Sequence, residues 1–597
     1  MGSVSEAVQV SATAVQLEAQ TSGLGKTVET RRVAELPLLG RSVLQLASLA
    51  PGVIPTRGQV GVGGDAIGQA GNARISGGLA NQNAILMDGG DSRGFTSGGQ
   101  SYSFPLESVA EFKVETANYS AEFGRSGGGV VNVASKSGTN QFHGVGYEYL
   151  RNNHLNANSW SNNRNKVPRT LFLHNEFGAA MGGPIKRDRT FFFANYEGVR
   201  EGSPRNFLAT VPVAGEKSGD FRGVFDRNGS QVLIYDYTTT RPNPSGTGFI
   251  RDPFPNNVIP SSRIHPISQN IVKYWPDANR TGEGPAQVNN YFKSGKNVTN
   301  VDLWFTRLDH QINDKHRIFG RFGGSQYANY ASGLIDPAFP ATSIASNPTR
   351  NAGISLTSTF SPNLLGEFRV SYTRLQNNSY PISEGFDLAS LGFSQSLANY
   401  VTYRQFPQIQ IQQYATGNGL AVATFGADEI TGLGGAGKNL LPQDSWGAQY
   451  HVTWVRGRHK FKGGVEFQRQ KMAAFNSRNS GGQFVFDRVY TQGPDPSVTA
   501  LNSGNAFASF LLGVPINGSL DTTPRMMLFQ RYNAGYFQDD WRISSRLTLN
   551  LGFRYEYTSP YGEKFGQIGY LDANAIEPVT GLKGLFKWVP PGGYHSN

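Results

Sequence analysis

The chain has 597 residues, of which 12% are aromatic, only 16% are charged and 73 are glycine. This length exceeds what one hydrophobic core usually supports, and the glycine and aromatic content favours many short strands and turns over helices. The net charge of +11 is dispersed and accompanies no nucleic-acid-binding motif, so we expect no nucleic-acid partner. There is no cysteine, which excludes a disulfide framework and thiolate metal ligands, and no apolar run is long enough for a transmembrane helix.

The first 30 residues are expected to form a tail and a linker rather than the start of a domain. The opening "MGSVSEAVQV" lacks the basic stretch and apolar core of a signal peptide. The segment "EAVQVSATA" alternates as a short strand does, and a polar Thr/Ser/Gly linker follows it.

Residues 31–140 are predicted to form a compact αβ unit. Apolar residues from Val43 to Leu49 recur at helical spacing before Pro51-Gly52, which predicts a short helix at about 41–49. The stretch "ARISGGLANQNAILMDGG" predicts two short strands, the second ending in a turn at Asp88 and Gly89. The segments "ESVAEFKVETANYSAEFG" and "GGGVVNVASKSG" complete the unit.

From residue 141 onwards the pattern changes to long alternating strands arranged in pairs. In "GEFRVSYTR" the side chains of Phe368, Val370 and Tyr372 should point to one face, and those of Glu367 and Arg369 to the other. Some turns between strands are minimal, whereas residues 201–301 and about 377–444 form long connections. Alternation alone fits a soluble sandwich as well as a membrane barrel, but this difference in loop length favours a barrel.

Aromatic residues near the predicted strand ends suit an interfacial girdle at the depth of the lipid headgroups, although ordinary core positions would explain them too. These residues are Tyr147, Tyr149, Trp446, Trp454, Tyr536 and Trp541.

Several motifs together resemble TonB-dependent outer-membrane receptors, most closely the Oar-like group with an N-terminal carboxypeptidase-regulatory-like domain. They are "ELPLLGRSVLQLASLAPGV", "ARISGG" with "ILMDGG", "ESVAEFKVETANYSAEFGRSGGGVVNVASKSGTNQFHG" and the hairpin "FQDDWRISSRLTLNLGFRYE". The resemblance implies a β-rich fold, an antiparallel transmembrane β-barrel with a small N-terminal αβ plug domain in its lumen. It also implies the outer membrane of a Gram-negative-type bacterium as the location.

The resemblance implies three regions in the chain. Residues 1–30 would be the tail of the regulatory-like domain, a linker and a possible TonB box, residues 31–140 the plug, and residues 141–597 the N-terminal part of the barrel with long extracellular loops. Alternation and turn signals predict roughly twelve barrel strands, against about 22 in plugged transporters. We therefore expect the chain to be a fragment that carries about half of the strands.

The implied function is uptake of a large nutrient, such as an oligosaccharide, peptide or metal chelate, by energised rearrangement of the plug. The implied partners are the energy-transducing protein TonB, outer-membrane lipid and the extracellular ligand. TonB would pair strand to strand with a short segment before the plug. The candidates for that segment are Glu6, Ala7, Val8, Gln9 and Val10, which fit the last strand of a regulatory-like domain equally well.

Seven residues match the plug motifs of the family: Arg74, Gly77, Asp88, Gly89, Glu122, Gly124 and Arg125. The four charged ones could form a network that holds the seal between plug and barrel wall, although a role in plug folding alone is at least as plausible. In the first barrel strand the resemblance places Gly144, Gly146 and Glu148 toward the lumen and Val145, Tyr147 and Tyr149 toward lipid.

Nothing in the sequence points to an enzyme, a cofactor or a metal site. "GLGGAGKN" at 432–439 imitates a phosphate loop, but Asn439 follows the lysine where Ser or Thr would bind Mg²⁺, and Pro442 interrupts any following helix. The nine histidines are scattered without ligand spacing. The alternative function is a secreted β-rich adhesin or glycan-binding protein, whose sheet would pack its apolar face against a second layer.

Overall fold

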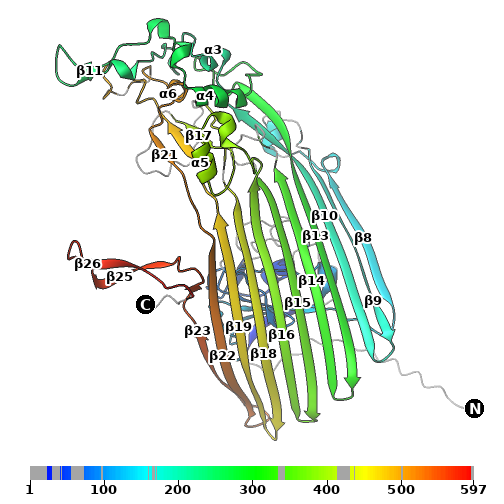
Figure 1. The fold of residues 1–597 in the computed structure, drawn as a ribbon. Helices are drawn as coiled ribbons and strands as arrows, with labels where there is room; N and C mark the ends of the chain where they lie inside the picture. The colour runs from blue at the N-terminus through cyan, green and yellow to red at the C-terminus, as the bar shows by residue number, and fades with distance from the viewer. Residues whose placement is uncertain are drawn as a thin grey trace, which may run out of the picture.

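The computed structural model describes residues 23–29, 41, 43–55, 73–95, 98–158, 160–164, 169, 171–331, 333, 343–412, 430–435, 437–498, 500 and 502–592. Figure 1 shows three parts: an N-terminal unit, a large sheet of long strands, and a cap of short elements beyond one end of that sheet. Among the described helices, none combines the length and the apolar character needed to cross a membrane.

The N-terminal unit is built on a five-stranded sheet of order β1-β6-β7-β4-β5, with a separate β2-β3 pair. Its elements are β1 (Leu24–Glu29), the 3-10 helix η2 (Val43–Leu49), β2 (Val53–Pro55), β3 (Ala73–Ile75), β4 (Ala84–Met87), β5 (Gly90–Asp91), η4 (Leu106–Ser108), β6 (Val109–Ala117) and β7 (Val130–Ser135). The helix predicted at 41–49 is therefore a 3-10 helix, and both predicted short strands are present as β3 and β4. Residues 24–29, which the prediction placed in a linker, form the edge strand β1 against β6.

The large sheet is antiparallel throughout and contains 12 strands in the order β23-β22-β19-β18-β16-β15-β14-β13-β10-β9-β8, with β24 added to β22. The strands are β8 (His143–Asn152), β9 (Leu173–Lys186), β10 (Thr190–Ala209), β13 (Tyr291–Asn313), β14 (His316–Ala331), β15 (Ser343–Ser361), β16 (Leu364–Pro381), β18 (Asn439–Arg456), β19 (His459–Asn476), β22 (Met526–Arg542), β23 (Thr548–Thr558) and β24 (Gly562–Glu563). In the described residues β8 pairs only with β9, and β23 only with β22, so the sheet is open. Closure into a barrel, and the share of its strands that this chain supplies, remain predictions.

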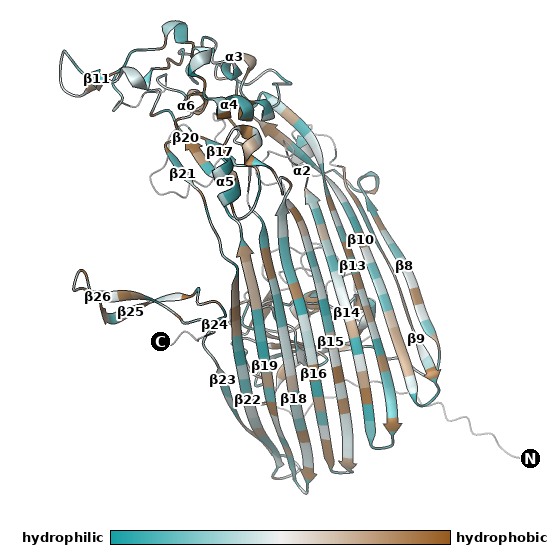
Figure 2. Ribbon diagram, viewed as in Figure 1, coloured by the Kyte–Doolittle hydropathy of each residue, from teal (hydrophilic) through white to brown (hydrophobic). Residues whose placement is uncertain are grey.

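We call the face of the sheet that contacts the N-terminal unit the inner face and the opposite one the outer face. Hydrophobic and hydrophilic residues alternate along the strands (Figure 2), as strands with two different faces require. On the outer face large apolar side chains are exposed: Phe368 by 45%, Phe467 by 54% and Leu551 by 55%. The predicted faces of "GEFRVSYTR" are thus confirmed, and no second layer covers the apolar side chains named here.

The predicted faces of β8 are wrong, because Tyr147 and Tyr149 point inward. The Tyr147 hydroxyl donates to Glu197 of β10 at 2.7 Å, and the guanidinium of Arg41 lies 4.3 Å from the Tyr147 ring and 5.6 Å from the Tyr149 ring. A tyrosine brings an apolar ring and a polar hydroxyl, so it can serve a polar inner face as well as a lipid face.

The same inward placement removes part of the predicted aromatic girdle. Tyr536 is only 8% exposed and contacts His451 on the inner face, with 2.9 Å between its hydroxyl and the imidazole Nδ1. Trp446 and Trp454 are exposed on the outer face by 54% and 40%, as predicted. Trp541 stacks on the ring of His459 at the short-turn end of the sheet.

The cap is formed by the three long connections β10–β13, β16–β18 and β19–β22, seen beyond the upper end of the sheet in Figure 1. Its elements are α3 (Ala214–Lys217), η6 (Tyr237–Thr239), β11 (Arg241–Pro242), β12 (Phe249–Ile250), η7 (Pro255–Asn257), η8 (Ser261–Arg263), α4 (Pro266–Ile271), η9 (Val272–Tyr274), η10 (Leu388–Leu391), α5 (Gln395–Tyr400), β17 (Gln408–Ile411), β20 (Gln483–Phe486), α6 (Ala506–Leu511) and β21 (Asn517–Ser519). Outside the cap lie η5 (Asn153–Leu155), α2 (Trp160–Arg164) and the hairpin of β25 (Gly569–Ile576) and β26 (Lys583–Trp588).

The cap has a hydrophobic core of its own, contributed by all three connections. Trp275 is 2% exposed and packs on Phe507 and Phe510, with ring centroids 5.5 and 5.3 Å apart. Its indole Nε1 donates to the carbonyl of Thr431 at 2.7 Å, which ties the first connection to the second. The long loops therefore fold together as one unit. Within it, Lys438 of "GLGGAGKN" pairs with Glu384 at 2.8 Å.

Candidate functional site at the inner face of the sheet

The tight turn at Asp88 and Gly89 fits into the inner face of the sheet. Both residues have positive φ, 47° and 75°, and a Cβ on Gly89 would overlap the guanidinium of Arg369 on β16. Glycine is required there because it lets the backbone approach the sheet without a side chain between them. The prediction of a turn at this position is confirmed.

The Asp88 carboxylate binds groups from both parts of the molecule. Within the N-terminal unit it accepts hydrogen bonds from the Ser135 backbone N–H and hydroxyl, each at 2.8 Å. Across the interface it pairs with Arg321 Nε of β14 at 2.9 Å and lies 3.7 Å from Arg307 Nη1 of β13. Arg321 also donates to the Met87 carbonyl at 2.9 Å. Charge-assisted hydrogen bonds of this kind are about twice as strong as neutral ones.

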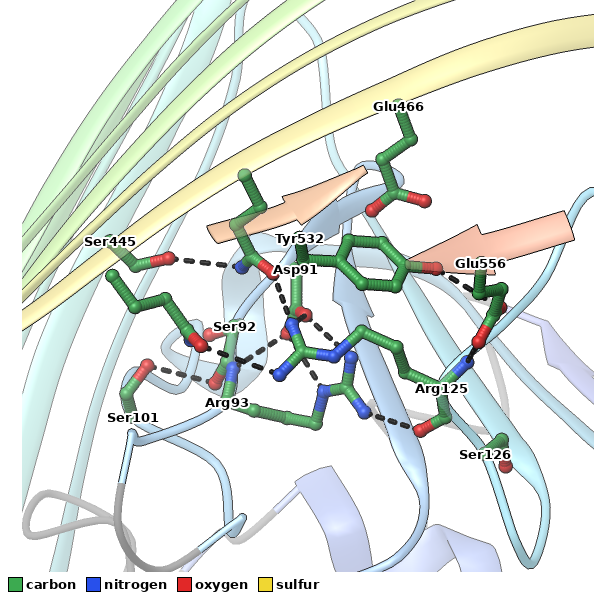
Figure 3. Close-up of polar contacts among 12 residues, drawn as sticks. Asp91, Ser92, Arg93, Ser101, Arg125, Ser126, Ser445, Glu466, Tyr532 and Glu556 are labelled. Carbon is green, nitrogen blue, oxygen red and sulfur yellow. Dashed lines mark hydrogen bonds and ion pairs between the residues drawn. The ribbon is translucent and has the colours of Figure 1, made fainter. Parts of the chain in front are cut away.

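A second cluster lies around Asp91 (Figure 3). Its carboxylate accepts hydrogen bonds from Arg93 at 2.6 and 2.9 Å and from Arg125 at 3.4 Å. Burial by itself would raise the pKa of Asp91, but the adjacent Arg93 and Arg125 outweigh it and lower that pKa to about 2. Asp91 is thus a fixed anion at neutral pH, held between two arginines.

Arg125 extends from this cluster to the sheet. Its guanidinium hydrogen-bonds to the side chains of Gln468 and Gln470 on β19 and lies 4.9 Å from the ring of Tyr532 on β22. Its backbone N–H donates to Glu556 of β23 at 3.1 Å. One arginine therefore connects the N-terminal unit to three neighbouring strands.

The sheet in turn holds the loop that contains Glu122 and Gly124. Arg554 of β23 donates to the Glu122 carbonyl at 3.0 Å and pairs with Glu466 at 2.8 Å and with Glu556 at 2.6 Å. A Cβ on Gly124 would overlap Glu556 and Arg554, so glycine allows this close approach.

Arg41 makes the corresponding contact with the opposite edge of the sheet. Its guanidinium lies 2.8 Å from Glu107 of the N-terminal unit, and 3.3 Å from both Glu176 of β9 and Glu197 of β10. Together with the ring of Tyr147, these carboxylates surround one cation whose side chain is 9% exposed. Arg41 has a φ of 49°, a conformation that costs a non-glycine residue about 1–2 kcal/mol.

A polar cavity of about 220 Å³ remains between the Asp88 and Asp91 clusters. The N-terminal unit contributes Asp88, Asp91 and Glu122 to its lining, and the sheet contributes residues such as Arg369 and His451. Both signs of charge meet at this cavity, so the contact between unit and sheet is ionic here. Elsewhere Ala180, Phe193 and Phe305 of the sheet join the hydrophobic core of the N-terminal unit. Within the described ranges, no three His, Cys, Asp or Glu side chains gather in a way that could hold a metal ion.

Five of the seven predicted plug residues lie together at this cavity: Asp88, Gly89, Glu122, Gly124 and Arg125. The other two lie elsewhere. Arg74 is at the exposed middle position of β3, and Gly77, with φ 81°, is in the turn that follows. The five candidates for TonB contact and the regulatory-like tail fall on residues 1–22, outside the described residues.

Sequence reasoning missed Arg41, Asp91 and Arg93, which carry much of the interface. Asp91 and Arg93 stand two residues apart directly after the recognised "DGG" turn, a spacing that allows their side chains to pair. Arg41 lies within the quoted motif "ELPLLGRSVLQLASLAPGV", where it is the only basic side chain. Attention to isolated charges inside apolar motifs would have selected it.

Comparison with known proteins agrees with this architecture. A family model described as outer membrane beta barrel domain matches residues 134–596. The TonB-dependent transporter Oar of Myxococcus xanthus is 22% identical, over 91% of this chain and 47% of that protein. The chain thus spans about half the length of this curated relative.

Solved structures of an outer membrane transporter and of a receptor are also similar. The transporter YddB from Escherichia coli matches with a TM-score of 0.54 and 12% identity, over 90% of this chain and 57% of that one. The siderophore receptor PirA from Acinetobacter baumannii matches with a TM-score of 0.45 and 14% identity, over 95% of this chain and 66% of that one. These relatives are transporters and receptors rather than enzymes. Because the family model matches well over half of the residues, the chain belongs to the family of outer-membrane β-barrel domains and, as a homologue of TonB-dependent transporters, is located in the outer membrane.

Proposed function

We propose that this chain supplies the plug and part of the barrel wall of a TonB-dependent receptor that takes up a large nutrient. The N-terminal unit acts as the plug, and the nutrient is an oligosaccharide, a peptide or a metal chelate. The observation that carries the proposal is the ionic contact of a separately folded N-terminal unit with the inner face of the sheet. No covalent chemistry is involved, because transport requires only that the plug be moved.

The composition of the interface supports a plug that can be displaced. When Asp88 and Arg321 separate, each replaces its protein partner with water, so the net cost in free energy is small. Separating an apolar interface costs the full free energy of its buried area. The apolar contact is local: Phe104 packs on Phe305 at 4.9 Å between centroids, and Phe305 lies 6.3 Å from Phe193. Directed force can therefore break the contacts in sequence while each part stays folded.

The topology indicates where such force would act. Strand β1 is the first described strand and lies at the edge of the N-terminal sheet, bonded only to β6. Traction on the chain before it would load the β1–β6 ladder first. We propose that TonB pairs with Glu6–Val10 by strand addition and delivers that traction, although the same segment fits the last strand of a regulatory-like domain.

The cap suggests where the nutrient first binds. Its three connections leave the long-loop end of the sheet, which is the extracellular end in outer-membrane barrels. Because the cap folds as one unit with its own core, it offers a preformed surface rather than three independent loops. The rival proposal of a secreted adhesin lacks its expected support, since side chains such as Phe467 are exposed on the outer face rather than packed on a second layer.

A disulfide tether tests the plug proposal. Position 90 on β5 faces Ser371 on β16, with 2.9 Å between the Cβ that Gly90 would carry and the Ser371 Cβ. This is slightly closer than disulfides need, so a small shift accommodates the bond. Residues 1–597 contain no cysteine, so the double variant Gly90→Cys/Ser371→Cys adds the only two thiols in this part of the protein. The matched control is Ser371→Cys/Gly447→Cys, which links β16 to β18 within the sheet.

The assay is depletion of a defined mixture of oligosaccharides, peptides and metal chelates by cells that make the full-length protein, with and without TonB, followed by mass spectrometry. We expect at least one compound to be depleted only with TonB. Oxidation of the plug–sheet tether should block its uptake, reduction should restore it, and the sheet–sheet tether should have no effect. Uptake that continues through the oxidised plug–sheet tether, or no TonB-dependent depletion at all, would refute the proposal.

A further inference from the structure

The inner face of the sheet carries an asparagine near the cap end of six neighbouring strands. Each stands an even number of positions from another inner-face side chain of its strand, such as Phe305, Arg321 or Arg369. Asparagine is depleted in β-strands, so its recurrence on one face of neighbouring strands needs a reason. We call the following residues the asparagine arc: Asn297 of β13, Asn329 of β14, Asn347 of β15, Asn377 of β16, Asn439 of β18 and Asn476 of β19.

The asparagine arc lies between the cap and the N-terminal unit. Asn476 is the last residue of β19, and the hydroxyl of Ser477 directly after it donates to Gln405 of the cap at 3.1 Å. Below the arc, the backbone N–H of Phe95 in the N-terminal unit donates to the side chain of Gln443 on β18 at 2.7 Å. A solute that moves along the sheet from the cap to the unit therefore passes the arc.

The inner face is uncharged between the asparagine arc and the charged residues that contact the N-terminal unit. Over this interval none of the described inner-face residues of the six strands is Asp, Glu, Lys or Arg. The outer face does carry charge at the same heights, since Arg350 adjoins Thr349 on β15 and Arg469 adjoins Gln470 on β19. Charge is thus kept away from one face of the sheet only.

The protein uses only part of the hydrogen-bonding capacity of the asparagine arc. An asparagine side chain has two N–H donors and a carbonyl oxygen with two lone pairs. Asn329 donates to the Thr299 hydroxyl at 2.8 Å, and Asn347 accepts from the backbone N–H of Asn378 at 2.7 Å. The Oδ1 atom of Asn297 is buried and has no partner among the described residues, which is unfavourable until a donor reaches it. Five of the six side chains are at least partly exposed, and Asn347 is buried.

We propose that the asparagine arc binds a neutral oligosaccharide on its way from the cap to the N-terminal unit. Neighbouring sugar hydroxyls donate and accept hydrogen bonds at the same time, and a side-chain amide offers both functions in one plane. A charged chelate or peptide terminus would give up its water here without meeting an opposite charge, which is costly. This inference rests on the proposed function and selects one of its three nutrient classes.

Competition among matched sugars tests the nutrient class. Cells that make the full-length protein, with and without TonB, receive neutral oligosaccharides of glucose, xylose, mannose and galactose, carboxylated oligogalacturonides and chitosan oligomers, all of equal length, together with peptides and ferric chelates. We expect TonB-dependent depletion of a neutral sugar, at least about tenfold faster than that of any other compound. Depletion of a chelate, a peptide or a charged sugar instead would overturn the arc proposal and leave the proposed receptor function intact, whereas no TonB-dependent depletion at all would overturn both.

Substitutions in the asparagine arc test the site itself. Asn377→Leu and Asn439→Leu each remove one amide, so uptake of the depleted neutral sugar below saturation should fall about fivefold in each variant and about 30-fold in the double variant. The matched control is Gln376→Leu, which removes an amide from the outer face of the same strand and should leave uptake unchanged. Uptake is compared at equal surface amounts of folded protein, and the single variants decide if the double variant does not fold. Unchanged uptake in the arc variants, or an equal loss in Gln376→Leu, would overturn the proposal.

Discussion

Replacing Asp91 by asparagine should loosen the N-terminal unit from the sheet while the sheet stays folded. The Asp91 side chain is 5% exposed and lies 2.6 Å from Arg93 and 3.4 Å from Arg125. Asparagine keeps the shape but removes the charge that both arginines share. Two poorly solvated guanidinium groups would then face each other, and Arg125 is the residue that reaches three strands of the sheet.

The size of the effect follows from the pKa and from the geometry. The pKa of Asp91 is about 2 against an ordinary 3.8, so its contribution is complete above pH 3.8 and is lost as the pH falls through about 2. At neutral pH that shift corresponds to about 2.5 kcal/mol. Removing one member of a buried pair typically costs about 3–5 kcal/mol, because it also leaves the partner charge unpaired. Because both arginines belong to the N-terminal unit, we expect a loss between about 2 and 4 kcal/mol in the local stability of the Asp91 cluster. The attachment to the sheet weakens through Arg125, which this cluster positions.

Hydrogen–deuterium exchange on the full-length protein measures this loss segment by segment. Peptides covering residues 82–95 and 120–127 should exchange about 30-fold faster or more, while β16 and β19 keep their protection. Asp572→Asn is the control, since it breaks the exposed pair with Lys587 in the β25–β26 hairpin. Unchanged protection at 82–95 and 120–127, or equal loss in unit and sheet, would refute the reasoning.

Three further substitutions test the cap and the interface loop. Burial raises the pKa of Glu216 to about 7 from 4.5, so the free energy of unfolding of the cap should fall by about 3 kcal/mol as the pH rises through this range. The variant Glu216→Gln should remove the dependence of the cap melting temperature on pH. A dependence that persists in the variant would contradict this. Trp275→Ala should destabilise the cap by about 3–5 kcal/mol and make its connections the first sites of limited proteolysis, whereas an unchanged cleavage pattern would show that the cap core is not cooperative. Gly124→Ala should displace the loop at 120–125 and speed its hydrogen exchange, while Gly223→Ala, at an open position in the cap, should not; equal behaviour of the two variants would argue against close packing at Gly124.

Side-chain alternation predicted the strands well where the two faces differ clearly in polarity. In β16, Phe368 and Val370 alternate with Glu367 and Arg369, and the apolar pair is on the outer face. In β8 the alternating residues are glycines and tyrosines, and a tyrosine suits either face. The face of Tyr147 is decided by Arg41, about a hundred positions earlier, which periodicity within one strand cannot reveal.

The cap was beyond prediction for a related reason. Its core joins Trp275, Phe406 and Phe510 from three connections that are each irregular in sequence. None of these residues belongs to a periodic pattern, so each connection resembles an ordinary long loop when considered alone. Only the arrangement of β10, β13, β16, β18, β19 and β22 in one sheet brings the connections to the same end.

The distribution of apolar and charged residues in the N-terminal unit separates its own stability from its attachment. The apolar residues Leu46, Ile75 and Val133 pack within the core of the unit, and each is at most 1% exposed. The charged residues lie at the surface that meets the sheet, where Asp88 and Arg125 find partners on several strands. Contacts among the core residues of the unit are kept when it separates from the sheet, whereas the ionic contacts, and the local packing of Phe104 on Phe305, are exchanged for water. A unit built in this way can leave the sheet as a folded body, and attachment and folding should respond to different substitutions.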